Sequence, residues 1–151
     1  MGPEDRLKDL CIILPEAPSP LGFYVPAVRV KDLLFLSGML PMREGKLLFK
    51  GKVGSDLTIE DAQEASKATL INALSVIKRE LGNLNKVKRV VRLSGYVASA
   101  PGFTQQPVVL NAASEILSKV FGDKGLHSRI VIGVSELPMN SPIEIELIIQ
   151  V

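Results

Sequence analysis

Residues 127–151 decide the fold, and they read HSRIVIGVSELPMNSPIEIELIIQV. Two strand-like runs, Ile130 to Val134 and Ile143 to Val151, are joined by a polar connection that contains prolines. In the second run every odd position is apolar, so these residues share one face and leave Glu144 and Glu146 on the other. An antiparallel pairing of the two strands would bring Arg129 close to Glu144. The stretch therefore predicts a site that could bind a small acid.

Upstream of this stretch, the pattern alternates between strand and helix signals. The prolines at 15, 18 and 20 act as a spacer, and Pro26 confines the strand that contains it to a sheet edge or a bulge. A loop with weak strand character around 47–49 is expected over 42–57. A short amphipathic helix is expected within 3–13, with Leu7, Leu10 and Cys11 facing inward. Strands are expected at 23–30 and 33–37, joined by a tight turn at Lys31-Asp32. Helices at 58–81 and 107–121 and a central strand at 87–97 follow.

The first long helix has the clearest boundaries. Thr58 can cap free backbone amides, and acidic residues in the first turn, such as Asp61, favour the helix dipole. Apolar residues then hold a helical period until Gly82, a typical residue for ending a helix. Gly122 ends the second long helix in the same way.

The order strand, strand, helix, strand, helix, strand, strand predicts an α+β two-layer sandwich. One sheet with two helices on one face satisfies this order with short connections. The other face of the sheet is expected to stay apolar on residues such as Ile145 and Leu147. Self-association is the expected cover for that face.

Composition indicates one domain in a reducing compartment. The chain has 151 residues, is 46% hydrophobic and carries a net charge of only +2, which is too balanced for a nucleic-acid footprint. Its single cysteine, Cys11, excludes an intramolecular disulfide and a multi-cysteine metal site, which suits the cytoplasm. No apolar run is long enough to span a membrane, and the N-terminus does not have the pattern of a secretory signal.

Four separated motifs resemble the Rid superfamily of YjgF-like reactive-intermediate deaminases, which were earlier described as L-PSP endoribonucleases. The most specific is Arg129 followed by Gly-Val-Ser-Glu-Leu-Pro and Ile-Glu-Ile-Glu, because its interval to Glu144 matches the two principal site residues of that family. The other three are Leu-Gly-Phe-Tyr-Val at 21–25, Leu-Phe-Leu-Ser-Gly-Met-Leu-Pro at 34–41, and Asp-Ala-Gln-Glu-Ala at 61–65.

The resemblance implies a chorismate-mutase-like fold, a homotrimer with ligand sites between subunits, and hydrolysis of 2-imino or enamino acids to 2-oxo acids and ammonia. By the same resemblance, Arg129 binds the substrate carboxylate and Glu144 holds the water. Tyr24, Ser37 and Asn111 match positions that line the same cleft, some of them from the neighbouring subunit. No cofactor or metal is implied. Orientation of substrate and water could suffice, because a protonated imine is already electrophilic.

The chain also departs from the family pattern. Many active relatives have a cysteine two residues after the arginine, where this chain has Val131, and that residue mainly lends its backbone to the site. Residues 1–20 form an extension before a single domain at 21–151, and the segment between Phe103 and Asn111 is longer than in short members. A non-catalytic trimer that binds small carboxylates or a partner protein is therefore the alternative function.

Other interpretations of the same residues remain open. Arg129 and Glu144 could form a structural ion pair, while Tyr24, Ser37 and Asn111 could each serve packing or local hydrogen bonding. His127 is expected to be a loop histidine, and Cys11 to be buried packing. The basic run from Lys86 to Arg92 is expected to be a solvated strand face. A ribonuclease is disfavoured because no aromatic stacking pattern accompanies it.

Overall fold

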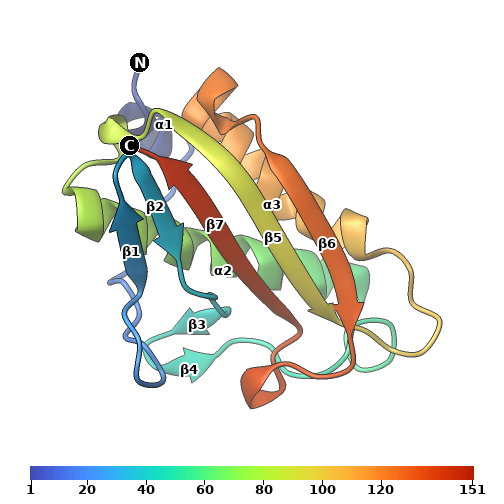
Figure 1. Ribbon diagram of the computed structural model, residues 1–151. Helices are drawn as coiled ribbons and strands as arrows, with labels where there is room; N and C mark the ends of the chain where they lie inside the picture. The colour runs from blue at the N-terminus through green and yellow to red at the C-terminus, as the bar shows by residue number, and fades with distance from the viewer.

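A five-stranded sheet carries two long helices on one face, as predicted (Figure 1). The computed structural model describes residues 1–151. The helices α2 (Ile59–Leu81) and α3 (Gln106–Phe121) lie side by side behind the sheet in this view. The strands lie in the order β1 (Ala27–Val30), β2 (Leu33–Leu36), β7 (Ile143–Gln150), β5 (Arg89–Ala98) and β6 (Ser128–Val134).

The predicted antiparallel pairing of the last two strands is wrong. Strand β5 lies between β6 and β7: it pairs parallel to β6 and antiparallel to β7. The cause is the connection between β5 and β6, which runs through helix α3. A helix-containing crossover returns the chain to the same end of the sheet, so the two strands that it joins are parallel. The last strand then inserts between β2 and β5 instead of folding back on β6.

The alternation in β7 places its apolar residues under the helices. Ile143, Ile145, Leu147 and Ile149 are at most 1% exposed, whereas Glu144 and Glu146 are partly buried on the opposite face. The expectation that Ile145 and Leu147 would face outward is therefore wrong. The open face is instead apolar through side chains of other strands, with Val28, Phe35, Ile130 and Ile132 between 40% and 51% exposed.

The predicted ends of both long helices are confirmed. Thr58 Oγ1 accepts a hydrogen bond from Asp61 N at 3.1 Å, and the Asp61 carboxylate accepts one from Thr58 N at 3.2 Å, which completes a capping box. At the other end Gly82 adopts a left-handed conformation with φ 79°, which glycine reaches without a Cβ penalty. Helix α3 ends at Phe121, and Gly122 is its C-cap residue.

The N-terminal helix is shorter than predicted. Helix α1 spans Pro3–Asp9, and only Leu7 of the three residues expected inward is buried; Leu10 and Cys11 are exposed. The helix ends early because Cys11 has φ 55°, a conformation that no right-handed helix contains. The Cys11 side chain is thereby turned out of the core.

Residues before the first hairpin also differ from the prediction. Strand β1 begins at Ala27, not Phe23, because Pro26 has no N–H to donate to a ladder. It is an edge strand, as Pro26 suggested, and its turn at Lys31 leads directly to β2. The predicted loop over 42–57 contains a small hairpin of β3 (Met42–Arg43) and β4 (Lys46–Leu47).

Three short 3₁₀ turns complete the chain: η1 (Leu84–Lys86), η2 (Gly122–Gly125) and η3 (Pro138–Asn140). The turn η1 precedes β5, which therefore starts at Arg89 and not at Val87. Of the basic residues expected on a solvated strand face, Lys86, Lys88 and Arg89 are exposed. Only Arg89 and Arg92 lie on β5, however, and Arg92 is partly buried. None of the helices combines the length and the apolar character that crossing a bilayer requires.

Candidate functional site

The surroundings of Glu144 disfavour the charged form of its carboxylate. Its side chain lies on the open face of β7, opposite Tyr96 of β5 and two residues from Glu146. Burial raises the pKa of the Glu144 carboxyl, and the negative charge of Glu146 raises it further. Neither a cation nor a hydrogen-bond donor of the same chain opposes these two effects. A carboxylate with a raised pKa is a better proton acceptor for a reaction near neutral pH.

A gap in the sheet exposes Glu144 to a cavity. Strand β2 pairs only with the last part of β7, up to Phe35 opposite Ile148, and the chain then turns away after Ser37. A single bridge between Met39 and Ile145 reconnects it to β7. Gly38 passes so close to Glu144 that an added Cβ would overlap the carboxylate oxygen and lie 2.9 Å from its Cδ. Glycine at 38 thus leaves the space that the Glu144 side chain occupies.

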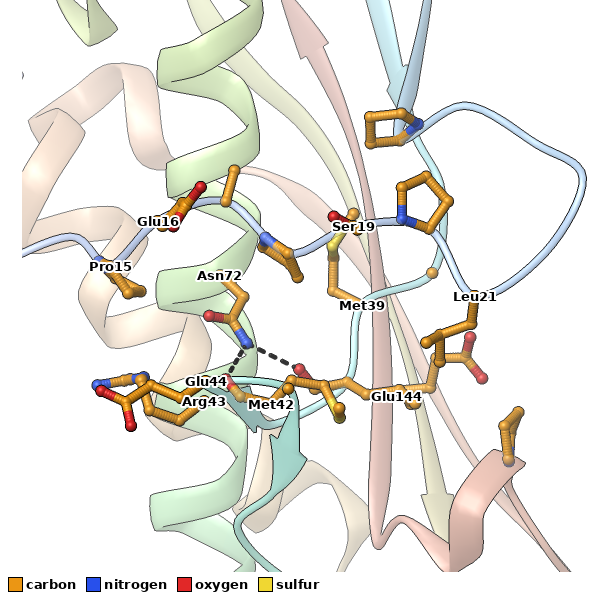
Figure 2. Close-up of a pocket in the computed structure, with 18 of the residues that line it drawn as sticks. Pro15, Glu16, Ser19, Leu21, Met39, Met42, Arg43, Glu44, Asn72 and Glu144 are labelled. Atoms are coloured by element: carbon orange, nitrogen blue, oxygen red, sulfur yellow. Dashed lines mark hydrogen bonds between the residues drawn. The ribbon is translucent and has the colours of Figure 1, made fainter.

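The cavity measures about 910 Å³ and lies between three segments of the chain. One wall is the N-terminal strap, residues 15–21; another is the turn of the β3–β4 hairpin; the third contains Glu144 and the chain from Gly38 to Leu40. Figure 2 shows Arg43 and Glu44 gathered near Pro15 and Glu16 at one end, with Glu144 and Leu21 at the other.

Asn72 of α2 holds the floor of this cavity in place. Its side-chain amide donates to the carbonyl oxygens of Leu40 at 3.0 Å and Met42 at 2.7 Å (Figure 2). Asn72 is only 2% exposed, so both bonds are shielded from water. The amide thereby ties the loop between β2 and β3 to the helix layer.

Arg129 is positioned by helix α3 on the edge strand β6. It stands opposite Leu93, which is buried under the helices, so the Arg129 side chain lies on the helix face of the sheet. Its guanidinium donates to Asn111 Oδ1 at 2.8 Å and to Ser114 Oγ at 3.1 Å. Asn111 thus forms a hydrogen bond within its own chain, one of the roles that the sequence left open for it. These bonds orient the arginine without neutralising it.

Arg129 and Glu144 do not meet within one chain. They lie on opposite faces of the sheet, and strand β5 separates their strands. Arg129 takes part in no salt bridge, so the interpretation of the two residues as a structural ion pair is wrong for the single chain. The expected proximity fails for the same reason as the expected strand pairing: the crossover through α3 inserts β5 between them.

The other predicted site residues divide between the two locations. Tyr24 lines the cavity with Glu144, and its hydroxyl accepts a hydrogen bond from Leu21 N at 3.2 Å. Ser37 is adjacent to the cavity but donates its hydroxyl to Val25 O at 2.6 Å, so it holds the loop before β1. Val131 lies on β6 two residues beyond Arg129 and packs partly buried against the core.

His127 has a local structural role, as expected. Its Nδ1 lies 2.6 Å from Gly125 O, and its Nε2 lies 3.0 Å from Ser114 Oγ, the same hydroxyl that accepts from Arg129. It therefore supports the arginine indirectly. No group of three or more histidine, cysteine, aspartate or glutamate side chains is arranged to hold a metal ion.

Sequence reasoning did not single out three residues of the cavity: Gly38, Arg43 and Asn72. Gly38 had a usable signal, because it follows Ser37 in one of the motifs of the resemblance. Arg43 and Asn72 had none. One is a charged residue in an expected loop, and the other is a polar residue within a helix, so only the folded chain shows what they face.

Comparison with known proteins identifies the family. Residues 4–151 match the family described as "YjgF/chorismate_mutase-like, putative endoribonuclease". The chain belongs to the YjgF-like family. This match includes helix α1 and the N-terminal strap as well as the sheet and the long helices.

Several relatives match nearly the whole chain. Protein TCP17 of Trypanosoma cruzi is 36% identical over 96% of this chain and 91% of its own length. The crystal structure of Atu1372 from Agrobacterium tumefaciens is 40% identical, with a TM-score of 0.92 over 99% of this chain and 92% of that one. A Shewanella oneidensis structure with an endoribonuclease description is 32% identical, with a TM-score of 0.96 over 100% of both chains.

One more distant relative has a named activity. It is the 2-iminobutanoate/2-iminopropanoate deaminase of Dermatophagoides farinae, which is 25% identical over 91% of this chain and 93% of its own length. The family thus contains proteins described by two different activities, a deaminase and an endoribonuclease.

Proposed function

We propose that this protein hydrolyses reactive 2-imino and enamino acids to 2-oxo acids and ammonia, in clefts between the subunits of a homotrimer. The observation that carries the proposal is the separation of Arg129 from Glu144. Hydrogen bonds orient Arg129, and Glu144 is partly buried, but neither forms a salt bridge in its own chain. A site that contains both can form only between two copies of the chain.

Arg129 supplies the carboxylate-binding half of the site. A guanidinium is a rigid fork that matches a carboxylate in two parallel hydrogen bonds, and such charge-assisted bonds contribute about 1.5–3 kcal/mol each. Asn111 and Ser114 already fix the orientation of the guanidinium. Because β6 is an edge strand, this group is within reach of a neighbouring subunit. Val131, on the same strand, takes the position of the family cysteine and contributes backbone to the cleft.

Glu144 supplies the water-activating half, with Tyr24 and Ser37 beside it. In the reaction one water adds to the iminium carbon, while the Glu144 carboxylate accepts a proton from that water. Glu144 then returns this proton to the nitrogen of the carbinolamine. The C–N bond breaks as the C=O bond forms, and the hydroxyl proton passes by way of Glu144 to the released ammonia. One iminium ion and one water thereby yield one 2-oxo acid and one ammonium ion.

Exposed apolar residues support assembly from several copies. The loop before β1 presents Leu21, Phe23 and Val25, which are 61%, 114% and 56% exposed, next to the mouth of the cavity. The open face of the sheet adds Phe35 and Ile130 at 40% and 45%. Several large apolar side chains this exposed favour cover by another subunit.

A coupled assay tests the proposal directly. An amino-acid oxidase generates 2-imino acids, and their decay is compared for the wild-type protein, Arg129→Ala, Glu144→Gln and buffer. Faster decay that either substitution reduces by about a hundredfold or more is expected, since each removes a positioning or proton-transfer group. Arg89→Ala serves as the matched control: it removes an exposed arginine at the start of β5, before Leu93 and Tyr96, which stand opposite Arg129 and Glu144.

Two other outcomes would support different functions. Tight binding of a small 2-oxo acid by the wild type without accelerated hydrolysis would favour the non-catalytic carboxylate-binding trimer. Cleavage of RNA that is lost in Glu144→Gln would favour the ribonuclease, the activity in the description of the Shewanella oneidensis relative.

A further inference from the structure

We infer that the cavity beneath the N-terminal strap receives the side chain of the substrate, and that Arg43 at its far end selects 2-imino acids whose side chain ends in an acidic group. The inference rests on the proposed function, because it takes Glu144 as the reacting end of the cavity. It adds a substrate class, namely dicarboxylic imino acids, and a residue that recognises it.

The shape of the cavity supports a long side chain. Between the end with Glu144 and Leu21 and the end with Arg43, Figure 2 shows the apolar side chains of Met39 and Met42. Its volume of about 910 Å³ is at the upper end of the range for small-molecule sites, which is about 300–1,000 Å³. An imino acid with a two-carbon side chain would leave most of this space to water.

Arg43 has an unmet hydrogen-bonding need. Its Nε is buried and has no hydrogen-bond partner, and its guanidinium takes part in no salt bridge. No salt bridge occupies the guanidinium, so its terminal nitrogens are the groups that can bind an acidic group in the cavity. An arginine is also the side chain best suited to bind a carboxylate.

Two acidic residues share this end of the cavity, and they do not neutralise Arg43. Glu16 and Glu44 both line it, but each is an exposed residue, and neither is paired with Arg43. Water screens the charges of these two exposed carboxylates strongly. Arg43 is partly buried, so water screens its charge less. Arg43 is the one cationic residue among those that line the cavity, so it is the side chain that can pair with an acidic group of a substrate there.

The N-terminal strap forms a large part of the cavity wall. Residues 15–21 contribute seven of the nineteen lining residues, including the prolines at 15, 18 and 20, which stiffen the wall. Helix α1 anchors the strap through Leu7 in the core and through Glu4, which bonds Lys78 and Leu84 N. The extension thus serves as a wall of the substrate pocket.

The test measures kcat/KM for 2-iminobutanoate and for 2-iminosuccinate, 2-iminoglutarate and 2-iminoadipate with wild-type protein, Arg43→Met and Lys46→Met. Lys46 is the matched control: it pairs with Arg43 across the hairpin, is exposed and does not line the cavity. At least one dicarboxylic substrate is expected to be preferred by the wild type. Arg43→Met is expected to lower that preference about tenfold or more, as for a lost charged hydrogen bond, and Lys46→Met to keep it.

The outcomes separate this inference from the proposed function. If 2-iminobutanoate is hydrolysed faster than in buffer but Arg43→Met leaves the preference as it was, the inference is overturned and the proposed function stands. If no imino acid is hydrolysed, the proposed function fails. The inference about the cavity is then tested by binding of 2-oxoadipate against 2-oxobutanoate: equal affinity in wild type and Arg43→Met would overturn it as well.

Discussion

Arg129 and Glu144 lie on opposite faces of one sheet, with strand β5 between their strands. Residues so separated cannot contact one small substrate in a single chain. A catalytic role for both requires that the arginine of one subunit meet the carboxylate of the next. The proposed inter-subunit site can therefore be tested by mixing a variant that lacks the arginine with a variant that lacks the glutamate.

Hybrid trimers test whether two subunits share one site. Arg129→Ala and Glu144→Gln are each expected to be inactive, but a mixture refolded or co-expressed at equal amounts regains about a quarter of the wild-type activity, because about one interface in four combines an intact arginine with an intact glutamate. Mixing either variant with itself is the control. Activity that stays at the level of the single variants in verified hybrids would place the whole site in one chain.

Gly38→Ala should impair the reaction through Glu144. The new Cβ would overlap the Glu144 carboxylate and displace it, and a shift of about 1 Å in a catalytic group lowers kcat by up to about a hundredfold. Steady-state kinetics with 2-iminobutanoate measures this loss. In the Glu144→Gln background the same substitution should cause little additional loss, because both changes act on one group. A full additional loss would contradict this explanation.

The acid limb of the pH–rate profile should respond to Glu146. Burial raises the pKa of Glu144 above its ordinary value of 4.5, and the charge of Glu146 contributes a further increase. Because Glu144 acts as a base only when ionised, kcat/KM falls as the pH drops through this raised pKa. Glu146→Gln removes a negative charge and retains an acceptor for Tyr96, whose hydroxyl donates to Glu146 at 3.1 Å. The acid limb should therefore move to lower pH; no movement, or movement to higher pH, would exclude Glu144 as the base.

Glu4 should stabilise the attachment of the N-terminal segment. Its carboxylate accepts from Lys78 Nζ at 2.8 Å and from Leu84 N at 3.0 Å. Burial alone would raise the pKa of Glu4, but these hydrogen bonds and the nearby lysines outweigh it and hold the pKa below 4.5. Glu4→Ala should lower the free energy of unfolding by about 1–2 kcal/mol at pH 7.

The pH dependence of that loss has a definite sign. A carboxyl whose pKa is lower in the folded state contributes stability above its unfolded pKa, and this contribution disappears as the pH falls through the folded pKa. The difference between wild type and Glu4→Ala in urea unfolding should therefore shrink below about pH 4.5. Asp9→Ala, at an exposed position of the same helix, is the control. A difference that persists undiminished at low pH would show that the carboxylate is not responsible.

The sequence by itself determined the local structure wherever a pattern repeats along the chain. The alternation of β7 placed its odd residues together on one face and Glu144 and Glu146 on the other, because side-chain direction in a strand has a period of two, but it did not show which face the helices cover. The capping box at Thr58 and the left-handed Gly82 set the ends of α2. These features depend on residues a few positions apart, so they can be predicted without knowing the fold.

Only the tertiary structure decided which distant residues meet. The crossover through α3 inserts β5 between β6 and β7, which separates Arg129 from Glu144 despite their short interval in the sequence. The same folding brings Gly38 against Glu144, Asn72 under the loop from β2 to β3, and Arg43 to the end of the cavity. Local patterns specify the face of an element, but strand order and the packing of loops follow from the burial of the whole core, which no local pattern encodes.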